Sequence, residues 1–217
     1  MATGTVCPEN SGHSLTQQTT ESACVCNAGY TGPVGGTCSA CVAGKYREER
    51  TVPLANVFCT VSQKYGCLSS SSQAEGYFLS NQQWPTPGYQ DHANCEWRIV
   101  ASVCVVNLTF VFGVTEYNYD FVSVFNCVDT TCTSKTQLQK MSGDCANNKA
   151  FCGSSTFSST TLLVTFTSDE QWSEFKGFNA SWKAEMVCND CAAGKYSEAI
   201  GSSNSNTCLE CPTCTYS

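Results

Sequence analysis

The sequence has few charged residues and no cluster of basic residues. Charged side chains make up 13% of the 217 residues, with a net charge of -7, which is about half the charged share of an average soluble domain. Binding to nucleic acid or to an anionic membrane needs clustered Lys and Arg that displace counterions. The composition therefore argues against both kinds of partner.

Catalytic motifs are lacking as well. The chain has two histidines, His13 in a low-complexity stretch and His92 just before Asn94. No serine nucleophile elbow and no glycine-rich phosphate loop accompanies either of them in the sequence. We therefore predict a protein that is not an enzyme and that carries no organic cofactor.

The sequence also has no long apolar run. The longest one, Val103 to Val114, is interrupted by Asn107, Thr109 and Gly113, and it is too short for the ~30 Å hydrocarbon core of a bilayer. Residues 1–8 lack the basic region and the apolar run of a signal peptide, so we expect that one was removed or that the sequence starts after it. The sequence predicts no integral membrane segment.

Cysteine, in contrast, is abundant, with 18 residues spread from Cys7 to Cys214. This density is typical of disulfide-bonded proteins in an oxidising compartment. We therefore predict an extracellular protein, either secreted or on the cell surface.

The two ends of the chain share a short repeat. The segment Cys38-Ser-Ala-Cys41-Val-Ala-Gly-Lys-Tyr46 returns as Cys188-Asn-Asp-Cys191-Ala-Ala-Gly-Lys-Tyr196, which indicates duplicated small modules. Both ends have few apolar residues, and pieces below about 40 residues normally need disulfides or a metal to hold their shape. We expect the cysteines to form the core of these modules.

The central part, residues 76–184, alternates between apolar and polar residues as β-strands do. In Val106–Phe112 the apolar residues Val106, Leu108, Phe110 and Phe112 share one face. Leu162, Val164 and Phe166 repeat the pattern, as do Phe178, Ala180 and Trp182. Several such strands joined by Ser-, Thr- and Gly-rich turns predict a mainly β protein, with two antiparallel sheets packed as a β-sandwich.

The order of motifs in this central part resembles a CUB domain over residues 67–184. The motifs that carry the resemblance are Cys67, Gly76-Tyr77-Phe78, Pro87-Gly88-Tyr89, Asn94-Cys95-Glu96-Trp97-Arg98-Ile99, Leu108-Thr109-Phe110, Tyr119-Asp120-Phe121-Val122, Phe151-Cys152-Gly153, Thr167-Ser168-Asp169 and Gly177-Phe178-Asn179-Ala180-Ser181-Trp182. The resemblance implies a Greek-key β-sandwich of about ten strands and a disulfide between Cys67 and Cys95.

The flanks resemble smaller cysteine-rich modules. Residues 1–38, with Cys24-Val-Cys26-Asn-Ala-Gly-Tyr-Thr-Gly32 before Cys38, are similar to an EGF-like module. The Cys-x-x-Cys-x-Ala-Gly-Lys-Tyr units are similar to ephrin-receptor-type repeats, which places such repeats at 39–66 and 185–217.

Further disulfides follow from spacing, which does not fix connectivity. The CUB family usually has a cysteine just before its Tyr-Asp pair, and this sequence lacks it, so Cys152 needs another partner. We expect the pairs Cys145–Cys152, Cys127–Cys132, Cys7–Cys24, Cys26–Cys38, Cys41–Cys59, Cys191–Cys208 and Cys211–Cys214, with Cys104 and Cys188 tying the sandwich to its C-terminal neighbour. The spacing of Cys188, Cys191, Cys208 and Cys211 also fits a four-thiolate zinc site, but the other fourteen cysteines favour disulfides.

The CUB resemblance also implies a calcium site. Many CUB domains hold calcium with three acidic residues, and the matching positions here are Glu116, Asp120 and Asp169. Three carboxylates at one end of a sandwich repel one another unless a cation lies between them, and calcium prefers oxygen ligands of this kind. The alternative is that they are solvated loop acids.

Other candidate sites are two glycosylation acceptors and three aromatic residues. Asn107-Leu-Thr109 and Asn179-Ala-Ser181 fit the N-glycosylation pattern, with each asparagine on the polar side of its strand. Trp84, Trp172 and Phe175 fall in loops, where they could anchor a partner or cap the sandwich.

Two functions fit these features. The first is a non-enzymatic building block of an extracellular assembly, such as a matrix, a surface hair or a fibre, in which copies or other protein chains are partners. The second is an adhesive or receptor-like module whose acidic calcium face captures a Lys or Arg of a protein ligand, with specificity in loops 113–120 and 168–176. We favour the first slightly.

Overall fold

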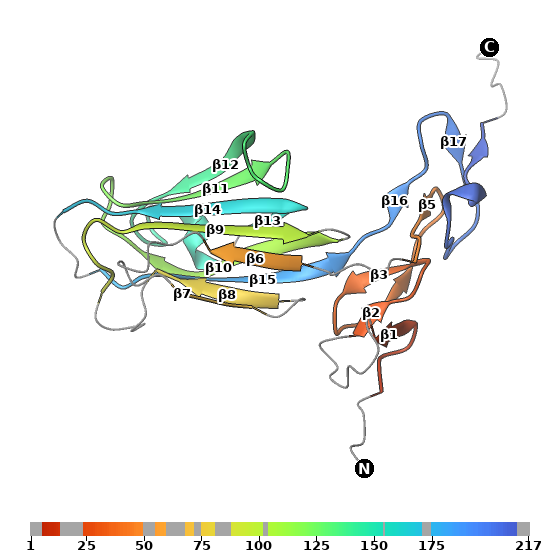
Figure 1. Ribbon diagram of the computed structural model, residues 1–217, viewed down its shortest axis with the longest axis horizontal. Coiled ribbons are helices and arrows are strands. Elements are labelled where there is room, and N and C mark those ends of the chain that lie inside the picture. Colours follow the sequence, from red (N-terminus) through yellow and green to blue (C-terminus); the bar gives the residue numbers. More distant parts are fainter. Residues whose placement is uncertain are drawn as a thin grey trace. The chain divides into compact units, whose positions relative to one another are not determined.

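The computed structural model describes residues 6–13, 24–49, 55–59, 68–71, 75–80, 88–101, 104–153, 155–170 and 175–211, with the backbone alone at 55–59, 68–71 and 152. The chain divides into two compact units, which can be followed in Figure 1. One unit is Pro53–Ala184, and the other combines Met1–Val52 with Glu185–Ser217. Within the described residues, no helix has the length and apolar character needed to cross a membrane.

The larger unit is an antiparallel β-sandwich. One sheet has the order β12–β11–β14–β9–β6. Its strands are β6 (Ala55–Cys59), β9 (Asn94–Ala101), β11 (Phe121–Cys127), β12 (Lys135–Met141) and β14 (Thr161–Thr167). In the other sheet β15 lies between β10 and β8, with β13 beyond β10 and β7 beyond β8. Its strands within this unit are β7 (Leu68–Ser71), β8 (Glu75–Leu79), β10 (Val105–Val114), β13 (Thr156–Ser159) and β15 (Gly177–Met186), of which the last two residues belong to the smaller unit.

Aromatic side chains from both sheets form the core of the sandwich. Phe178 on β15 is fully buried, and its ring lies 5.4 Å from that of Phe166 on β14 and 5.6 Å from that of Trp97 on β9. Along β9 and β10 buried residues alternate with more exposed ones. Because successive side chains of a strand point to opposite faces, this alternation gives each sheet one apolar face. The predicted antiparallel β-sandwich with disulfide-rich ends is confirmed.

The smaller unit consists of short strands joined by disulfides. Its elements are β1 (Ser11–His13), β2 (Cys24–Cys26), β3 (Tyr30–Pro33), β4 (Ser39–Ala40), β5 (Lys45–Tyr46), β16 (Asn189–Asp190), β17 (Lys195–Tyr196), η4 (Ser205–Thr207) and β18 (Leu209–Glu210). Arg47 is buried among them, and its guanidinium donates hydrogen bonds to the carbonyl groups of Cys26, Asn27 and Tyr30. Backbone carbonyls and cysteines thus replace an apolar core here.

Between fully described residues, four of the expected disulfides are present: Cys7–Cys24, Cys26–Cys38, Cys127–Cys132 and Cys191–Cys208. Cys95 and Cys145 are also disulfide-bonded. The partners expected for them lie outside what the structure describes, since Cys67 is not described and Cys152 is described by its backbone alone. Cys211, by contrast, is a free, exposed cysteine, so it does not form the expected bond with Cys214.

Two further expected pairs are wrong. Cys41 bonds Cys188 across 147 residues, so neither Cys41–Cys59 nor Cys104–Cys188 forms. The physical reason is that the whole sandwich is inserted between Cys41 and Cys188. Cys59 lies on β6, whose backbone pairs with β9 in the sandwich rather than joining a repeat over 39–66. Cys104 is buried within the larger unit.

The disulfides occupy three of the four cysteines that the alternative zinc site would need. Cys188, Cys191 and Cys208 are all disulfide-bonded, so they supply no thiolates to a metal. A second group, Cys7, His13 and Cys24, lies close enough for a metal, but its two cysteines are bonded to each other.

Candidate metal centre

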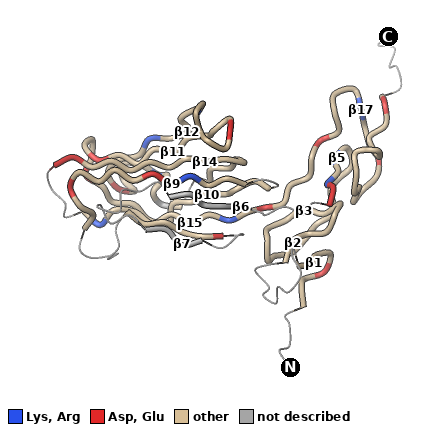
Figure 2. Tube along the Cα trace, in the orientation of Figure 1, with Lys and Arg blue, Asp and Glu red and all other residues tan. Residues whose placement is uncertain are grey.

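The three acidic residues singled out in the sequence lie together at one end of the sandwich. Glu116 follows β10, Asp120 precedes β11, and Asp169 follows β14. Strands β11 and β14 are antiparallel neighbours in which Phe121 pairs with Thr167, so the start of one meets the end of the other. Carboxylate oxygens of the three residues lie within 4.8 Å of one another. Figure 2 shows the acidic residues gathered at this loop end of the sandwich.

The short loop between Glu116 and Asp120 is held against the segment at Ser142 and Gly143. Asn118 takes a left-handed conformation with φ 67°, and its N–H donates to Ser142 Oγ at 2.7 Å. Ser142 Oγ in turn donates to the Glu116 carbonyl at 2.9 Å. Asn tolerates this backbone region better than most residues. These bonds fix the loop that carries two of the three carboxylates.

Asp169 is fixed by the loop that precedes β9. Its carbonyl accepts a hydrogen bond from His92 N at 2.7 Å, and its N–H donates to Asp120 Oδ1 at 2.9 Å. Ser168 Oγ donates to the Gln90 carbonyl at 2.8 Å. His92 itself is exposed beside Glu170, with 4.0 Å between His92 Nε2 and Glu170 Oε2.

Tyr89 completes the site, and it was not among the predicted site residues. Its hydroxyl donates to Asp120 Oδ2 and accepts from Glu116 N at 3.0 Å, so one side chain links two of the acidic positions. The ring is buried against Phe166. The Pro87-Gly88-Tyr89 motif marked this residue in the sequence, but nothing in the pattern showed which carboxylate its hydroxyl would reach.

Burial and repulsion between neighbouring charges disfavour the charged forms of Glu116 and Asp120. Burial raises the pKa of Glu116, and the charges of Asp169 and Asp120 raise it further. Burial is also the largest cause that raises the pKa of Asp120, although hydrogen bonds from Tyr89 and Asp169 partly oppose it. Burial, followed by the hydrogen bond to Asp120, raises the pKa of Tyr89 far above its usual value, which keeps its hydroxyl a donor.

Glu116 Oε2 is buried and has no hydrogen-bond partner within the described part of the chain. A buried carboxylate oxygen without a partner is costly. Calcium prefers hard oxygen ligands, and the carboxylates of these three side chains supply them. The site therefore fits a calcium ion, with Glu116, Asp120 and Asp169 as the side chains that would hold it.

The other predicted site residues fall elsewhere. Asn107 and Asn179 are on the faces of β10 and β15 opposite to the buried Leu108 and Phe178, as expected, and Asn107 Oδ1 accepts a hydrogen bond from Ser158 Oγ at 2.6 Å. Phe175 is half-buried, and its carbonyl accepts from Tyr89 N. Trp84 and Trp172 lie outside the described residues.

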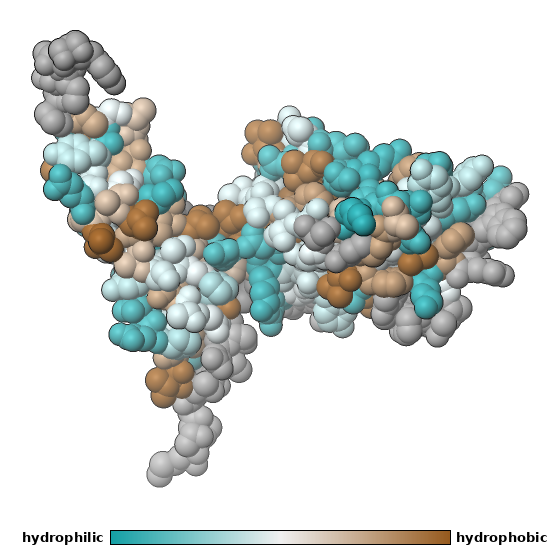
Figure 3. All heavy atoms as spheres, turned by 180° about the vertical axis from the view of Figure 1, so that it is seen from behind, coloured by the Kyte–Doolittle hydropathy of each residue, from teal (hydrophilic) through white to brown (hydrophobic). Residues whose placement is uncertain are grey.

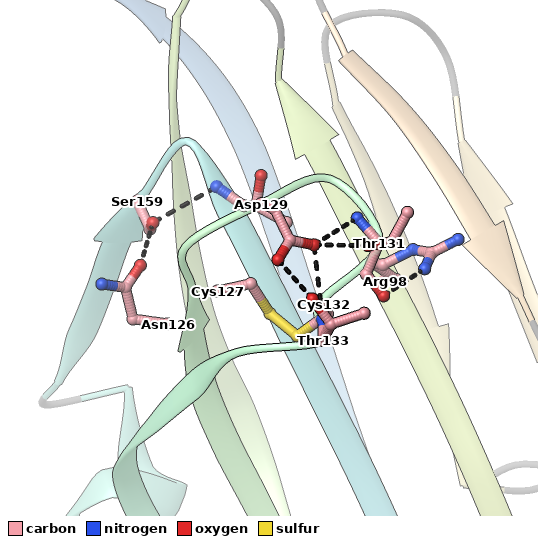
Figure 4. The surroundings of a disulfide bond; sticks show 9 residues. Arg98, Asn126, Cys127, Asp129, Thr131, Cys132, Thr133 and Ser159 are labelled. Carbon is pink, nitrogen blue, oxygen red and sulfur yellow. Dashed lines mark hydrogen bonds between the residues drawn. A yellow bond between two sulfur atoms is a disulfide. The ribbon is translucent and has the colours of Figure 1, made fainter.

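A second ordered feature is the disulfide-closed turn between β11 and β12, shown in Figure 4. The Asp129 carboxylate accepts hydrogen bonds from the N–H and hydroxyl groups of both Thr131 and Thr133. These bonds lower the pKa of Asp129 well below its usual value. Arg98 on β9 donates to the Thr131 carbonyl at 2.9 Å, which ties the turn to a strand two positions away in the sheet.

The fold and its loop end define a class, the disulfide-bonded antiparallel β-sandwich with three acidic residues gathered among its loops. The family model of the CUB domain matches residues 67–182, more than half of the chain. The chain therefore belongs to the CUB domain family. CUB domains are typically extracellular and mediate protein–protein interactions.

Three solved structures are similar to parts of the chain. The full extracellular region of zebrafish Gpr126/Adgrg6 is 28% identical, with 52% of this chain and 14% of that one covered and a TM-score of 0.41. The CUB1-EGF-CUB2 domain of human MASP-1/3 is 19% identical, with coverages of 63% and 48% and a TM-score of 0.39. The CUB1-EGF-CUB2 domains of rat MASP-1 are 20% identical, with coverages of 69% and 58% and a TM-score of 0.42. The matched region spans less than two thirds of each of these structures, and no curated protein matches the chain.

Proposed function

We propose that this protein is an extracellular, non-enzymatic binding module whose sandwich end holds calcium and captures a cationic side chain of a protein partner. The observation that carries the proposal is the convergence of Glu116, Asp120 and Asp169, with Glu116 Oε2 buried and unpaired within the described residues. Calcium would supply the positive charge that lets all three carboxylates stay ionised together.

The charge balance favours a Lys or Arg as the captured group. Three ionised carboxylates exceed the charge of one calcium ion, so the site keeps a negative charge after the ion is bound. Tyr117 and Tyr119, which flank Asn118 in the same loop, are 54% and 61% exposed. Exposed tyrosine rings beside an anionic site offer cation–π contacts to such a side chain. Specificity would then lie in loops 113–120 and 168–176, of which 171–174 is not described.

The distribution of apolar side chains on one face of the molecule also supports this choice of site. On the face drawn in Figure 3, the apolar side chains of the described residues form small, separate groups in a mostly polar surface. Contiguous apolar patches of several hundred Å² are the usual mark of an apolar docking site. An interface built on the acidic loop end needs no such patch.

A calcium titration followed by thermal unfolding tests the proposal. With an affinity of order 10⁻⁴ M, calcium at a hundred times its dissociation constant would stabilise the fold by about 2.7 kcal/mol. This should raise the Tm by several degrees. We expect the rise to disappear in Glu116→Gln and to persist in Glu170→Gln, which removes the same charge from an exposed residue next to Asp169. An unchanged Tm with calcium, or an equal rise in Glu116→Gln, contradicts the calcium site.

A surface coated with poly-lysine tests the captured group. Binding that requires calcium and fails in Glu116→Gln supports capture of a cationic side chain. Equal binding in a chelator would mean general attraction between poly-lysine and a protein of net charge -7, and would contradict the proposed role of calcium.

The second candidate function is a building block of an extracellular assembly. The disulfides of the smaller unit favour it, because they join both ends of the chain through Cys41–Cys188 into one cross-linked body that could dock one sandwich to the next. In this proposal the ends are EGF-like and ephrin-receptor-type repeats, and Asn107 and Asn179 carry N-glycans. Electron microscopy of the secreted protein should show filaments or large oligomers, whereas a monodisperse monomer in calcium contradicts self-assembly.

A further inference from the structure

The smaller unit contains one structural pattern three times. We call each copy a rung and define it by its disulfide: Cys26–Cys38 for the first, Cys41–Cys188 for the second and Cys191–Cys208 for the third. In every rung the first cysteine is followed three residues later by a glycine with positive φ. These glycines are Gly29, Gly44 and Gly194, with φ of 81°, 80° and 82°. Positive φ at these values favours glycine over other residues.

The strand pairing repeats in the same register. The two residues after each glycine pair with the two residues after the second cysteine of the same rung, giving β3 with β4, β5 with β16 and β17 with β18. In the second and third rungs an ion pair joins equivalent positions, Lys45 to Asp190 at 2.7 Å and Lys195 to Glu210 at 3.1 Å. The rungs are therefore copies in three dimensions as well as in sequence.

A single backbone hydrogen bond marks where each following rung begins. Cys41, the first cysteine of the second rung, donates its N–H to the Gly29 carbonyl at 2.8 Å. Cys191, the first cysteine of the third rung, donates its N–H to the Gly44 carbonyl at 2.9 Å. Cys211 donates its N–H to the Gly194 carbonyl at 2.8 Å. By its hydrogen bond and its place after β18, Cys211 occupies the first position of a fourth rung.

Two groups at the end of the third rung, the Cys211 thiol and the Gly194 N–H, have no partner within the described residues. Cys211 is exposed and forms no disulfide with any of them, although the equivalent Cys41 and Cys191 are both bonded. The N–H of Gly29 donates to Arg47 and that of Gly44 donates to Ser197, each in the following rung. For Gly194 no acceptor occurs among the described residues. A fourth rung would supply both missing partners.

The second rung shows what such a partner needs. Its second cysteine, Cys188, lies 147 residues from Cys41, with the whole sandwich between them. A rung therefore closes on a cysteine that is remote in sequence, provided that the two residues after that cysteine can pair with the strand. All other cysteines described in the smaller unit are already in disulfides.

We propose that Cys211 is an attachment site for the second cysteine of a further repeat of this type, carried on a Cys-x-x-Cys segment. The bond would form by thiol–disulfide exchange with a disulfide oxidant. The Cys211 thiolate attacks the oxidant and releases one of its thiols, and the partner thiolate then attacks the Cys211 sulfur and releases the other. Two protein thiols become one disulfide, and the oxidant takes up the two electrons and two protons.

A grafted rung tests this proposal on the full chain. Residues 212–217 are replaced by a second copy of residues 192–211, and the secreted protein is mapped by proteolysis without reduction. We expect Cys211 to bond the grafted copy of Cys208, which leaves the grafted copy of Cys211 open to alkylation. A matched control changes the grafted copy of Gly194 to Val, which keeps every cysteine and its spacing but disfavours positive φ. This control should lose most of the bond.

The source of the partner is tested with a separate peptide of residues 202–211 in which Cys211→Ser leaves one thiol. The native chain and the peptide are mixed in a glutathione redox buffer, with a scrambled peptide of the same composition as reference. Preferential capture of the peptide by Cys211 allows a second chain to supply the rung, and capture by the graft alone assigns it to the same polypeptide. Failure of both arms, equal bonding in the Val control, or a Cys211–Cys214 bond in the native chain overturns the proposal. None of these outcomes bears on the calcium site.

Discussion

The two units of this protein are held together by different means. The sandwich buries large aromatic side chains from both sheets, among them Phe78, Trp97, Phe166 and Phe178. In the smaller unit most buried hydrophobic positions are cysteines, such as Cys24, Cys26, Cys38 and Cys41. Side-chain burial can support a domain of the larger unit's size, whereas very small modules need covalent cross-links.

This difference separates how each unit responds to a substitution. Loss of a core side chain should weaken the sandwich and leave the disulfide-held unit intact. Loss of a disulfide should do the opposite. The predictions below use this contrast, from the largest expected effect to the smallest.

The largest effect is expected for Phe178→Ala. Phe178 contacts four aromatic rings from both sheets and is fully buried, so its truncation leaves a cavity at the centre of the sandwich. Truncations of this kind cost about 3 to 5 kcal/mol. Denaturant unfolding followed by tryptophan fluorescence should show the loss, while peptide mapping should still recover Cys191–Cys208. Loss of that disulfide in the variant would show that the two units do not fold independently.

The next effect is the loss of the third rung in the double variant Cys191→Ser with Cys208→Ser. Their bond closes a loop with a sequence separation of 17, for which the chain-entropy relation gives about 3 kcal/mol. Amide exchange should become fast over β17 and β18, with the exchange of β9 and β14 unchanged. Slow exchange of β17 and β18 in the variant would mean that something other than the disulfide holds this rung.

The same contrast explains which parts of the fold could be predicted from the sequence. The alternation along β9, β10 and β15 reports burial directly, because side chains of a strand alternate between faces. Local disulfides such as Cys7–Cys24 and Cys191–Cys208 also follow from short spacing. Cys41–Cys188 could not be predicted in this way, since the repeat is interrupted by an inserted domain and spacing along the chain no longer reflects distance in space.

The candidate metal site also has a part that the sequence predicted and a part that it did not. The positions of Glu116, Asp120 and Asp169 followed from the family resemblance, and the structure brings their oxygens together. The hydroxyl of Tyr89 between Asp120 and Glu116 was not predicted. A hydrogen bond between a residue before β9 and one before β11 depends on tertiary packing, which no periodicity in the sequence reports.

Calcium should reverse the direction in which the stability of the sandwich changes with pH. The pKa values of Glu116 and Asp120 are raised in the folded protein, so without calcium their contribution to stability is lost as the pH rises through these raised values. Calcium binds the ionised forms, so the Tm rise that it causes should be largest near neutral pH and shrink on acidification. Thermal melts from pH 7.5 to pH 5, with and without calcium, measure both trends. A calcium-induced rise that is independent of pH would mean that these carboxylates do not hold the ion.

The smallest effect is expected at the turn between β11 and β12. Asp129→Asn removes a carboxylate that accepts from Thr131 and Thr133, but the Cys127–Cys132 bond and the contact of Arg98 with Thr131 remain. We therefore expect the Tm to shift by less than about 2 °C at neutral pH. The pKa of Asp129 is lower in the folded protein than in the unfolded chain. The contribution of its carboxylate to stability is therefore fully present above the unfolded pKa, and it is lost as the pH falls through the folded pKa. Amide exchange at Thr131 and Thr133 should rise in the variant, and a further change of Cys127 and Cys132 to Ser should spread this increase along β12. If Asp129→Asn alone speeds exchange along β12, the carboxylate rather than the disulfide holds this turn. The Cys127–Cys132 bond would then not stabilise its part of the sandwich in the way that the disulfides stabilise the smaller unit.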